Sequence, residues 1–163
     1  MIRWTEKEYA LLGGKPLPKT TYASSKQVIS GYKSNVSGWR TIGEHEHYFR
    51  SLWEINYAIT LQWYKKTGQI GDWEFEPCLF KFPKDAYQAS PFQYLPDFKV
   101  TENNGSHAWH EVKGYMDAAS KKKIKRFNKH YPKEKLIIID SKWFADARKK
   151  QINVLLDWEK LPK

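Results

Sequence analysis

The feature that most constrains the fold is the stretch 94–113, which has the pattern of two β-strands joined by a tight turn. Residues 93–101 carry enough alternating apolar and aromatic side chains to form a strand with one buried face. Residues 102–105, with the sequence ENNG, are a strong turn signal, and residues 107–113 can return as a second strand. We therefore predict a β-hairpin around which the rest of the chain is organised.

Three polar side chains of this hairpin can converge on one site. Glu111 and Lys113 are two residues apart, so they point to the same face of a strand, and Asp97 faces them if the pairing register allows it. Carboxylates are hard oxygen ligands for Mg²⁺, and a neighbouring lysine can orient a water molecule or offset charge on a phosphate. The pattern predicts Mg²⁺-dependent hydrolysis of phosphodiester bonds. The alternative is an exposed hairpin with a surface Glu–Lys pair.

Residues 50–66 have the pattern of a helix that is buried on nearly all sides, because apolar side chains cover most of its circumference. Glu54 is unusual there, since a buried carboxylate needs a structural partner or a cation. Beside Asp97 we interpret Glu54 as a further oxygen ligand for the metal, with a structural partner as the alternative. Arg50 and Ser51, at the start of this helix, could hold a phosphate against its N-terminus.

The chain after the hairpin predicts a β-α-β unit. Asp117 is a plausible N-cap for a helix over residues 118–131, and residues 135–140 form a short apolar run typical of a strand buried on both faces. A right-handed crossover would place this strand in the same sheet as the second hairpin strand. Ser141 can cap a last helix over residues 143–158, which would pack on the sheet or on a partner chain.

Two further strand regions precede the hairpin. Residues 39–47 have the pattern of a short hairpin, and residues 73–82 that of a strand interrupted at Pro77, near the edge of a sheet. Glu74 and Glu76 share a face of that strand, which we interpret as solvated or ion-paired, with an approach of one of them to the site as the alternative. The chain as a whole predicts an α/β fold with a mixed central β-sheet flanked by helices.

The domain organisation follows from the segments without a regular pattern. Residues 1–38 are basic and largely irregular, apart from a short candidate helix at 5–12, so we expect an N-terminal arm. Residues 84–91 are a polar connection. At 163 residues the chain can form one well-buried domain, which we place at residues 39–163 with the C-terminal helix included.

The positive charge of this chain is concentrated beside the predicted site. The formal net charge is +10, yet residues 41–112 hold ten acidic residues against six basic ones, whereas residues 113–135 hold nine basic against two acidic. Basic flanks around an acidic centre suit a polyanion that is held by its backbone. We predict that the basic side chains of the helix at 118–131 contact DNA, with a solvated helix face as the alternative. These side chains are Lys121, Lys122, Lys123, Lys125, Arg126 and Lys129.

The remaining composition indicates an intracellular protein. The single cysteine, Cys78, excludes an internal disulfide and every zinc site that needs a pair of cysteines. The sequence contains no apolar run of about 18 residues and no secretory signal pattern. We therefore expect no membrane insertion and a location in the cytoplasm.

The order of these parts resembles the PD-(D/E)XK, restriction-endonuclease-like nuclease superfamily. Within it, the sequences FRSLWE at 49–54, YLPDF at 94–98 and EVKG at 111–114 are similar to those of the bacteriophage endonuclease I-type Holliday-junction resolvases. The resemblance covers about residues 39–140. It implies a restriction-endonuclease-like core and a phage-encoded enzyme acting in the host cytoplasm.

The resemblance also implies roles for individual residues. Glu54, Asp97 and Glu111 would bind one or two Mg²⁺ ions, which Mn²⁺ could replace, and Lys113 would lie beside the attacking water. A homodimer is implied, since a four-way junction requires two symmetric cuts. We therefore predict a Mg²⁺-dependent DNA endonuclease that is selective for branched or Holliday-junction DNA. The alternatives are a nicking or double-strand endonuclease without junction preference, or a non-catalytic DNA-binding module.

Overall fold

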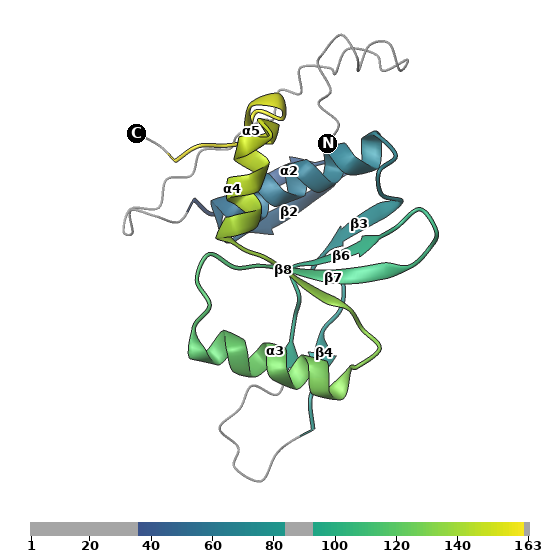
Figure 1. The fold of residues 1–163 in the computed structure, drawn as a ribbon. Helices are drawn as coiled ribbons and strands as arrows, with labels where there is room; N and C mark the ends of the chain where they lie inside the picture. Colours follow the sequence, from purple (N-terminus) through teal and green to yellow (C-terminus); the bar gives the residue numbers. More distant parts are fainter. Residues whose placement is uncertain (1–35, 84–92, 162–163) are drawn as a thin grey trace.

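The computed structural model describes residues 36–83 and 93–161, and a four-stranded mixed sheet lies at its centre (Figure 1). The strand order is β3-β6-β7-β8, with bounds β3 Asp72–Phe75, β6 Phe98–Thr101, β7 His107–Val112 and β8 Leu136–Ile139. β6 is antiparallel to both of its neighbours, β3 and β7, whereas β8 is parallel to β7. The predicted α/β fold with a mixed central sheet is confirmed, as is the β-α-β unit that ends in β8.

The β6–β7 hairpin determines which side chains meet at its open end. Its turn contains Gly105 with a φ of +82°, a conformation that glycine adopts without strain. Phe98 pairs with His110, so the next step of this antiparallel register places Asp97 opposite Glu111. Opposed residues of an antiparallel pair lie on the same face of the sheet. The pairing register that places Asp97 on the same face as Glu111, which the predicted site required, is therefore present.

Helices cover both faces of the sheet (Figure 1). They are α2 Leu52–Lys66, α3 Ala118–His130, α4 Ser141–Lys149 and α5 Ile152–Leu155. Phe98 and Val112 belong to the large apolar core that the sheet forms with α2 and α4, whereas Trp109 packs in a second cluster with Phe127 of α3. Because side chains alternate along a strand, Glu111 lies on the same face as Trp109. The sheet therefore separates Glu111 from most of α2.

Two small sheets complete the fold. They consist of β1 Gly38–Ile42 with β2 His45–Phe49, and of β4 Phe80–Lys81 with β5 Gln93–Tyr94. The hairpin predicted at 39–47 is confirmed. The regions 73–82 and 93–101, each predicted as one strand, are each split between two sheets. In the first region Glu76 has a φ of +47° and Pro77 lacks an N–H, so the chain bends away from the central sheet.

The prediction of a single long helix over residues 143–158 is wrong, because the structure has two shorter helices there. Asp140 is the N-cap of α4, in place of Ser141, because its Oδ1 accepts hydrogen bonds from the N–H groups of Lys142 at 3.0 Å and Trp143 at 3.1 Å. Gln151 has a φ of +60° and separates α4 from the short helix α5. A residue in this left-handed conformation cannot continue a right-handed helix.

The segment after α5 is hydrogen bonded to α2 and β1. The Asn56 amide donates to the Glu159 carbonyl at 3.1 Å, and its Oδ1 accepts from the Glu159 N–H at 2.8 Å. Trp158 Nε1 donates to Thr60 Oγ1 at 3.1 Å. Arg40 binds both oxygens of the Glu159 carboxylate, at 2.6 and 2.9 Å. The C-terminal segment is therefore part of the domain core.

We expect the Asn56→Ala substitution to lower the free energy of unfolding by about 1 kcal/mol, because it leaves two backbone groups of Glu159 without their partner. Urea denaturation followed by circular dichroism measures this change. Asn128→Ala is the control, since Asn128 is exposed on α3 and alanine is a good helix former. Equal losses of unfolding free energy in both variants would show that the hydrogen bonds between Asn56 and Glu159 contribute nothing specific to stability.

Several predictions concern residues that the structure does not describe. The N-terminal arm at 1–38 lies outside the described residues except at its end, and so do the helix at 5–12 and the connection at 84–91. Among the helices of the described ranges, none is long and apolar enough to cross a membrane.

Candidate functional site

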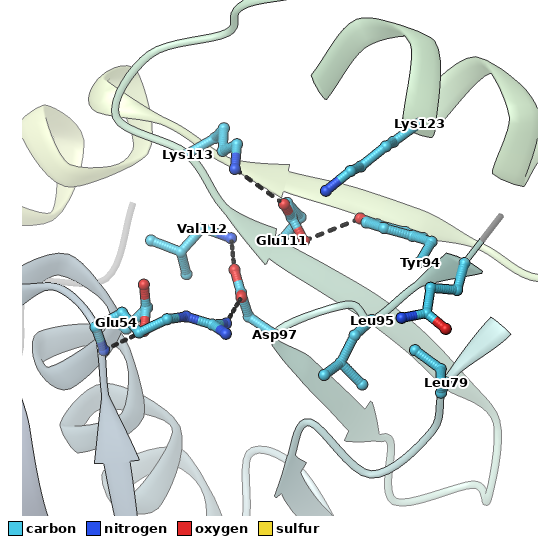
Figure 2. Close-up of a pocket in the computed structure, with 11 residues that line it drawn as sticks. Glu54, Leu79, Tyr94, Leu95, Asp97, Glu111, Val112, Lys113 and Lys123 are labelled. Atoms are coloured by element: carbon cyan, nitrogen blue, oxygen red, sulfur yellow. Dashed lines mark hydrogen bonds and ion pairs between the residues drawn. The ribbon is translucent and has the colours of Figure 1, made fainter. Parts of the chain in front are cut away.

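Asp97 directly precedes β6, Glu111 lies near the end of β7, and both line one pocket (Figure 2). Both are almost completely buried, with 6% and 7% of their surface exposed. The Val112 backbone N–H donates to Asp97 Oδ2 at 2.8 Å, and the Tyr94 hydroxyl donates to Glu111 Oε2 at 2.9 Å. Each carboxylate is therefore oriented by one uncharged donor from an adjacent part of the fold.

Basic side chains from three parts of the chain lie beside these two carboxylates. Lys113 Nζ lies 3.4 Å from Glu111 Oε1, and Arg50 Nη2 lies 3.4 Å from Asp97 Oδ1. Lys123 extends from α3 toward Glu111 (Figure 2), and all five residues line a pocket of about 340 Å³. The prediction that Glu111 and Lys113 share a face is confirmed. The pocket combines buried negative charge with positive charge at its rim.

The two carboxylates are difficult to ionise together. Burial, and after it the negative charges of Glu111 and Glu54, raise the pKa of Asp97 to about 8. Burial also raises the pKa of Glu111, although Lys113 acts in the opposite direction. Two buried carboxylates that repel one another can both ionise at neutral pH when a cation lies between them. The donor set therefore fits a hard divalent cation.

Glu54 is also buried, but a structural role accounts for its position. Ser51 is the N-cap of α2, and its Oγ accepts a hydrogen bond from the Glu54 N–H at 3.2 Å. The Glu54 carboxylate accepts from the Ser51 hydroxyl and from the Arg50 backbone N–H, both at 2.9 Å. These contacts form a variant of the capping box, in which Ser and Glu three residues apart satisfy the first N–H groups of a helix. The Ser-x-x-Glu spacing was the sequence signal that could have identified this partner.

The predicted set of three carboxylate ligands is not assembled in this structure. In residues 36–83 and 93–161 there is no group of three or more His, Cys, Asp or Glu side chains that could hold a metal ion. Mg²⁺ commonly binds one or two protein carboxylates and completes its six ligands with water and substrate phosphate oxygens. Asp97 and Glu111 meet this requirement without Glu54. The role of Glu54 as a metal ligand stays a prediction.

The two residues predicted to hold a phosphate at the start of α2 have partners within the protein. Ser51 caps the helix. The Arg50 guanidinium is ion-paired with Glu76 as well as with Asp97, although its side chain is 56% exposed. Their binding to phosphate stays a prediction. Of the two glutamates considered on the strand at 73–82, Glu76 is therefore the one that reaches the site, through Arg50, while Glu74 pairs with Lys99.

The basic residues of α3 differ in their surroundings. Lys123 lines the pocket, whereas Arg126 donates to the Pro83 carbonyl at 2.7 Å and lies over the Phe82 ring. Arg126 therefore anchors α3 to the segment that directly follows β4. The remaining basic residues of the predicted DNA-binding face are exposed to solvent; they are Lys121, Lys122, Lys125 and Lys129.

Sequence reasoning missed Tyr94 as a site residue. Its ring contacts Phe127 of α3, with ring centroids 5.3 Å apart, and its hydroxyl reaches Glu111. Burial and the charge of Glu111 raise the pKa of Tyr94, so the hydroxyl stays a hydrogen-bond donor. The alternation around residue 94 indicates a buried aromatic residue but carries no signal for the partner of its hydroxyl.

Comparison with known proteins places the chain in a family. No curated protein and no solved structure matches the chain. The sequence pattern of one family matches residues 39–149, more than half of the chain, from β1 to the end of α4. This segment includes Asp97, Glu111, Lys113 and the whole of α3. The chain therefore belongs to the family described as Protein of unknown function (DUF1064).

Proposed function

We propose that this protein is a Mg²⁺-dependent DNA endonuclease that hydrolyses phosphodiester bonds. The observation that carries the proposal is the buried pair Asp97 and Glu111, with Lys113 at 3.4 Å from Glu111. A buried pair of carboxylates with raised pKa values inside a pocket is typical of a functional site. Both carboxylates line one pocket together with Lys113, Arg50 and Lys123.

The chain's own residues have distinct parts in this reaction. Mg²⁺ held by Asp97 and Glu111 would polarise the phosphate and lower the pKa of a water molecule, and Mn²⁺, which accepts the same oxygen ligands, is expected to replace it. The Tyr94 hydroxyl and the Val112 N–H keep the two carboxylates oriented. Lys113 lies beside Glu111, where it can orient the attacking water and offset charge on the phosphate.

The proposed substrate is a polyanion held by its backbone. Phosphate contacts position a protein on DNA without reading the sequence, and the exposed lysines of α3, the helix whose Lys123 lines the pocket, could provide such contacts. We further propose branched DNA, including four-way junctions, as the preferred substrate, on the basis of the sequences at 49–54 and 94–98. Two symmetric cuts in a junction would require a homodimer. The proposed place of action is the cytoplasm.

Cleavage of three end-labelled substrates tests the proposal. These are a four-way junction, the linear duplex of one of its arms and single-stranded DNA, each incubated with MgCl₂ or with EDTA. We expect cutting of the junction that requires Mg²⁺, with paired symmetric cuts. Equal cutting of the linear duplex would retain the chemistry and remove the junction preference. Binding of DNA without any cutting would show that the protein is a non-catalytic DNA-binding module and not an enzyme.

The exposed lysines of α3 are expected to set the salt dependence of DNA binding. Replacing Lys122 or Lys129 by alanine should weaken binding to all DNA sequences and reduce the slope of log K against log [salt] by about 0.9 for each phosphate contact removed. Fluorescence anisotropy over a series of NaCl concentrations measures the slope. Lys142→Ala, on α4 at the opposite face of the sheet, is the control. An unchanged slope in both α3 variants would exclude this helix from the DNA interface.

A further inference from the structure

The Arg50 guanidinium is shared unequally between two carboxylates at the mouth of the site. Its Nη2 atom is ion-paired with Glu76 Oε1 and also lies 3.4 Å from Asp97 Oδ1, close to the limit for a hydrogen bond. The Asp97 side chain is 8% exposed, the Glu76 side chain 23% and the Arg50 side chain 56%. The closer partner of Arg50 is therefore Glu76, which lies nearer the solvent.

The backbone holds all three residues in place. The Glu76 N–H donates to the Asp97 carbonyl at 2.8 Å, and the Arg50 N–H donates to the Glu54 carboxylate at 2.9 Å. Glu76 also has a φ of +47°, a left-handed conformation that is strained for a residue with a side chain. This bend occurs directly after β3 and brings the Glu76 carboxylate to Arg50. The position of Glu76 is thus specified by the fold.

The alternative partner of Arg50 has a consequence for the site. Without Glu76, Asp97 would be the carboxylate that remains within hydrogen-bond distance of the guanidinium, while the charge of Glu54 also attracts it. A fixed cation on Asp97 would compete with a divalent ion for the same oxygen. A guanidinium paired with Asp97 would also be less available to an anionic group at the exposed mouth of the pocket.

We propose that Glu76 is a positioning residue that draws the Arg50 guanidinium off Asp97. Asp97 is thereby left available to a divalent cation, and Arg50 is held at the mouth of the pocket, where it can contact a phosphate. Both effects rest on the cation site of the proposed function, and the phosphate contact rests in addition on its DNA substrate. Glu76 acts only through Arg50 and contacts no reacting group.

A double-mutant cycle tests this role by titrating the DNA-free protein with MnCl₂ and MgCl₂ in a calorimeter. The variants are Glu76→Gln, Arg50→Gln and the double variant. The Glu76→Gln substitution is expected to weaken cation binding about fivefold, from the size of a partly exposed ion pair. In the Arg50→Gln background the same substitution should change the affinity less than twofold, because the guanidinium that Glu76 positions is gone.

Glu74→Gln is the matched control. It removes the same charge two residues earlier on the chain, but Glu74 pairs with Lys99 at 3.3 Å and does not contact Arg50. We expect less than a twofold change. Three results would each overturn the proposal, because Glu76 would then act through its charge alone or not at all. They are an equal loss of affinity in the wild-type and Arg50→Gln backgrounds, the same loss in Glu74→Gln, and no loss in Glu76→Gln.

A second variant keeps the test valid if Glu76→Gln folds poorly. Glu76→Gly removes the carboxylate and relieves the positive φ, so it should fold at least as stably and weaken cation binding by the same factor.

Comparing DNA cleavage with cation binding separates the positioning role of Glu76 from the proposed endonuclease function. The KM for DNA is measured for wild type and for Glu76→Gln. If cation affinities change as expected in the double-mutant cycle but the protein cleaves no DNA, the proposed function is rejected and the role of Glu76 is supported. A wild-type protein that binds neither cation would overturn both.

Discussion

Lys113→Ala is expected to lower the rate of DNA cleavage by on the order of 10²- to 10³-fold, which is typical for removal of one charge-stabilising group from an active site. Lys113 Nζ lies 3.4 Å from Glu111, and its side chain is only 32% exposed. Its removal takes away the nearest positive charge to Glu111 and a donor to the attacking water. Binding of DNA should change by no more than a few fold, because the α3 lysines remain.

Single-turnover cleavage with Mg²⁺ measures this rate, and anisotropy measures binding. Lys99→Ala is the matched control, since Lys99 lies on the same sheet and is 3.3 Å from a carboxylate, but that carboxylate is the exposed Glu74. The same purification of both variants also controls for contaminating nucleases. A Lys113→Ala protein that cuts as fast as the wild type would refute the catalytic assignment.

The metal-free protein is expected to lose about 1.5 kcal/mol of stability as the pH rises from 6.5 to 8, because of Asp97. Its pKa is about 8 in the folded protein, against an ordinary value of 3.8. A carboxyl group whose pKa is higher in the folded state stabilises the fold while it is protonated. Its contribution is therefore complete at low pH and is lost as the pH rises through 8.

Urea denaturation in EDTA at pH 6.5 and pH 8 measures this loss. Asp97→Asn should remove most of the pH dependence and should be more stable than the wild type at pH 8. MgCl₂ should stabilise the wild type more at pH 8 than at pH 6.5, because the cation binds the ionised carboxylate, and should not stabilise the Asn variant. Asp146→Asn, at a half-exposed ion pair of α4, is the control. The same pH dependence in wild type and Asp97→Asn would contradict the assignment.

The pH range is chosen to exclude a second buried group. His110 lies on the opposite face of β7 from Glu111, and burial, together with the charge of Lys135, lowers its pKa to about 4. A histidine whose pKa is lower in the folded state stabilises the fold while it is neutral. Its contribution is lost as the pH falls from 6.5 toward 4, which is opposite in sign to that of Asp97.

Local sequence patterns predicted the elements that carry the site. The ENNG turn and the two alternating strands predicted the β6–β7 hairpin, and the spacing of Glu111 and Lys113 placed both on one face. The N-cap Asp117 and the apolar run at 135–140 predicted α3 and β8. These features depend on residues a few positions apart, so period and capping rules are sufficient to find them.

Patterns were less reliable where one residue had two local explanations. The helical period correctly indicated that Glu54 is buried, and its burial was then interpreted as a sign of a metal ligand. The capping contacts with Ser51 explain the same burial by a neighbour three residues away. The left-handed residues Glu76 and Gln151 ended predicted elements early, because non-glycine residues give little sequence signal for a positive φ.

By itself, the sequence determined the class of fold, the hairpin, the basic helix and the identity of the residues that could form a site. Only the tertiary structure decided that Asp97 faces Glu111, that Tyr94 and Val112 orient them, that Glu76 holds Arg50, and that Asn56 binds Glu159. The physical reason is that periodicity and capping act within a few residues, whereas the hydrogen bonds and the ion pair among these contacts join residues 15 to 103 positions apart. Their partners are selected by strand register and packing, which no local pattern encodes.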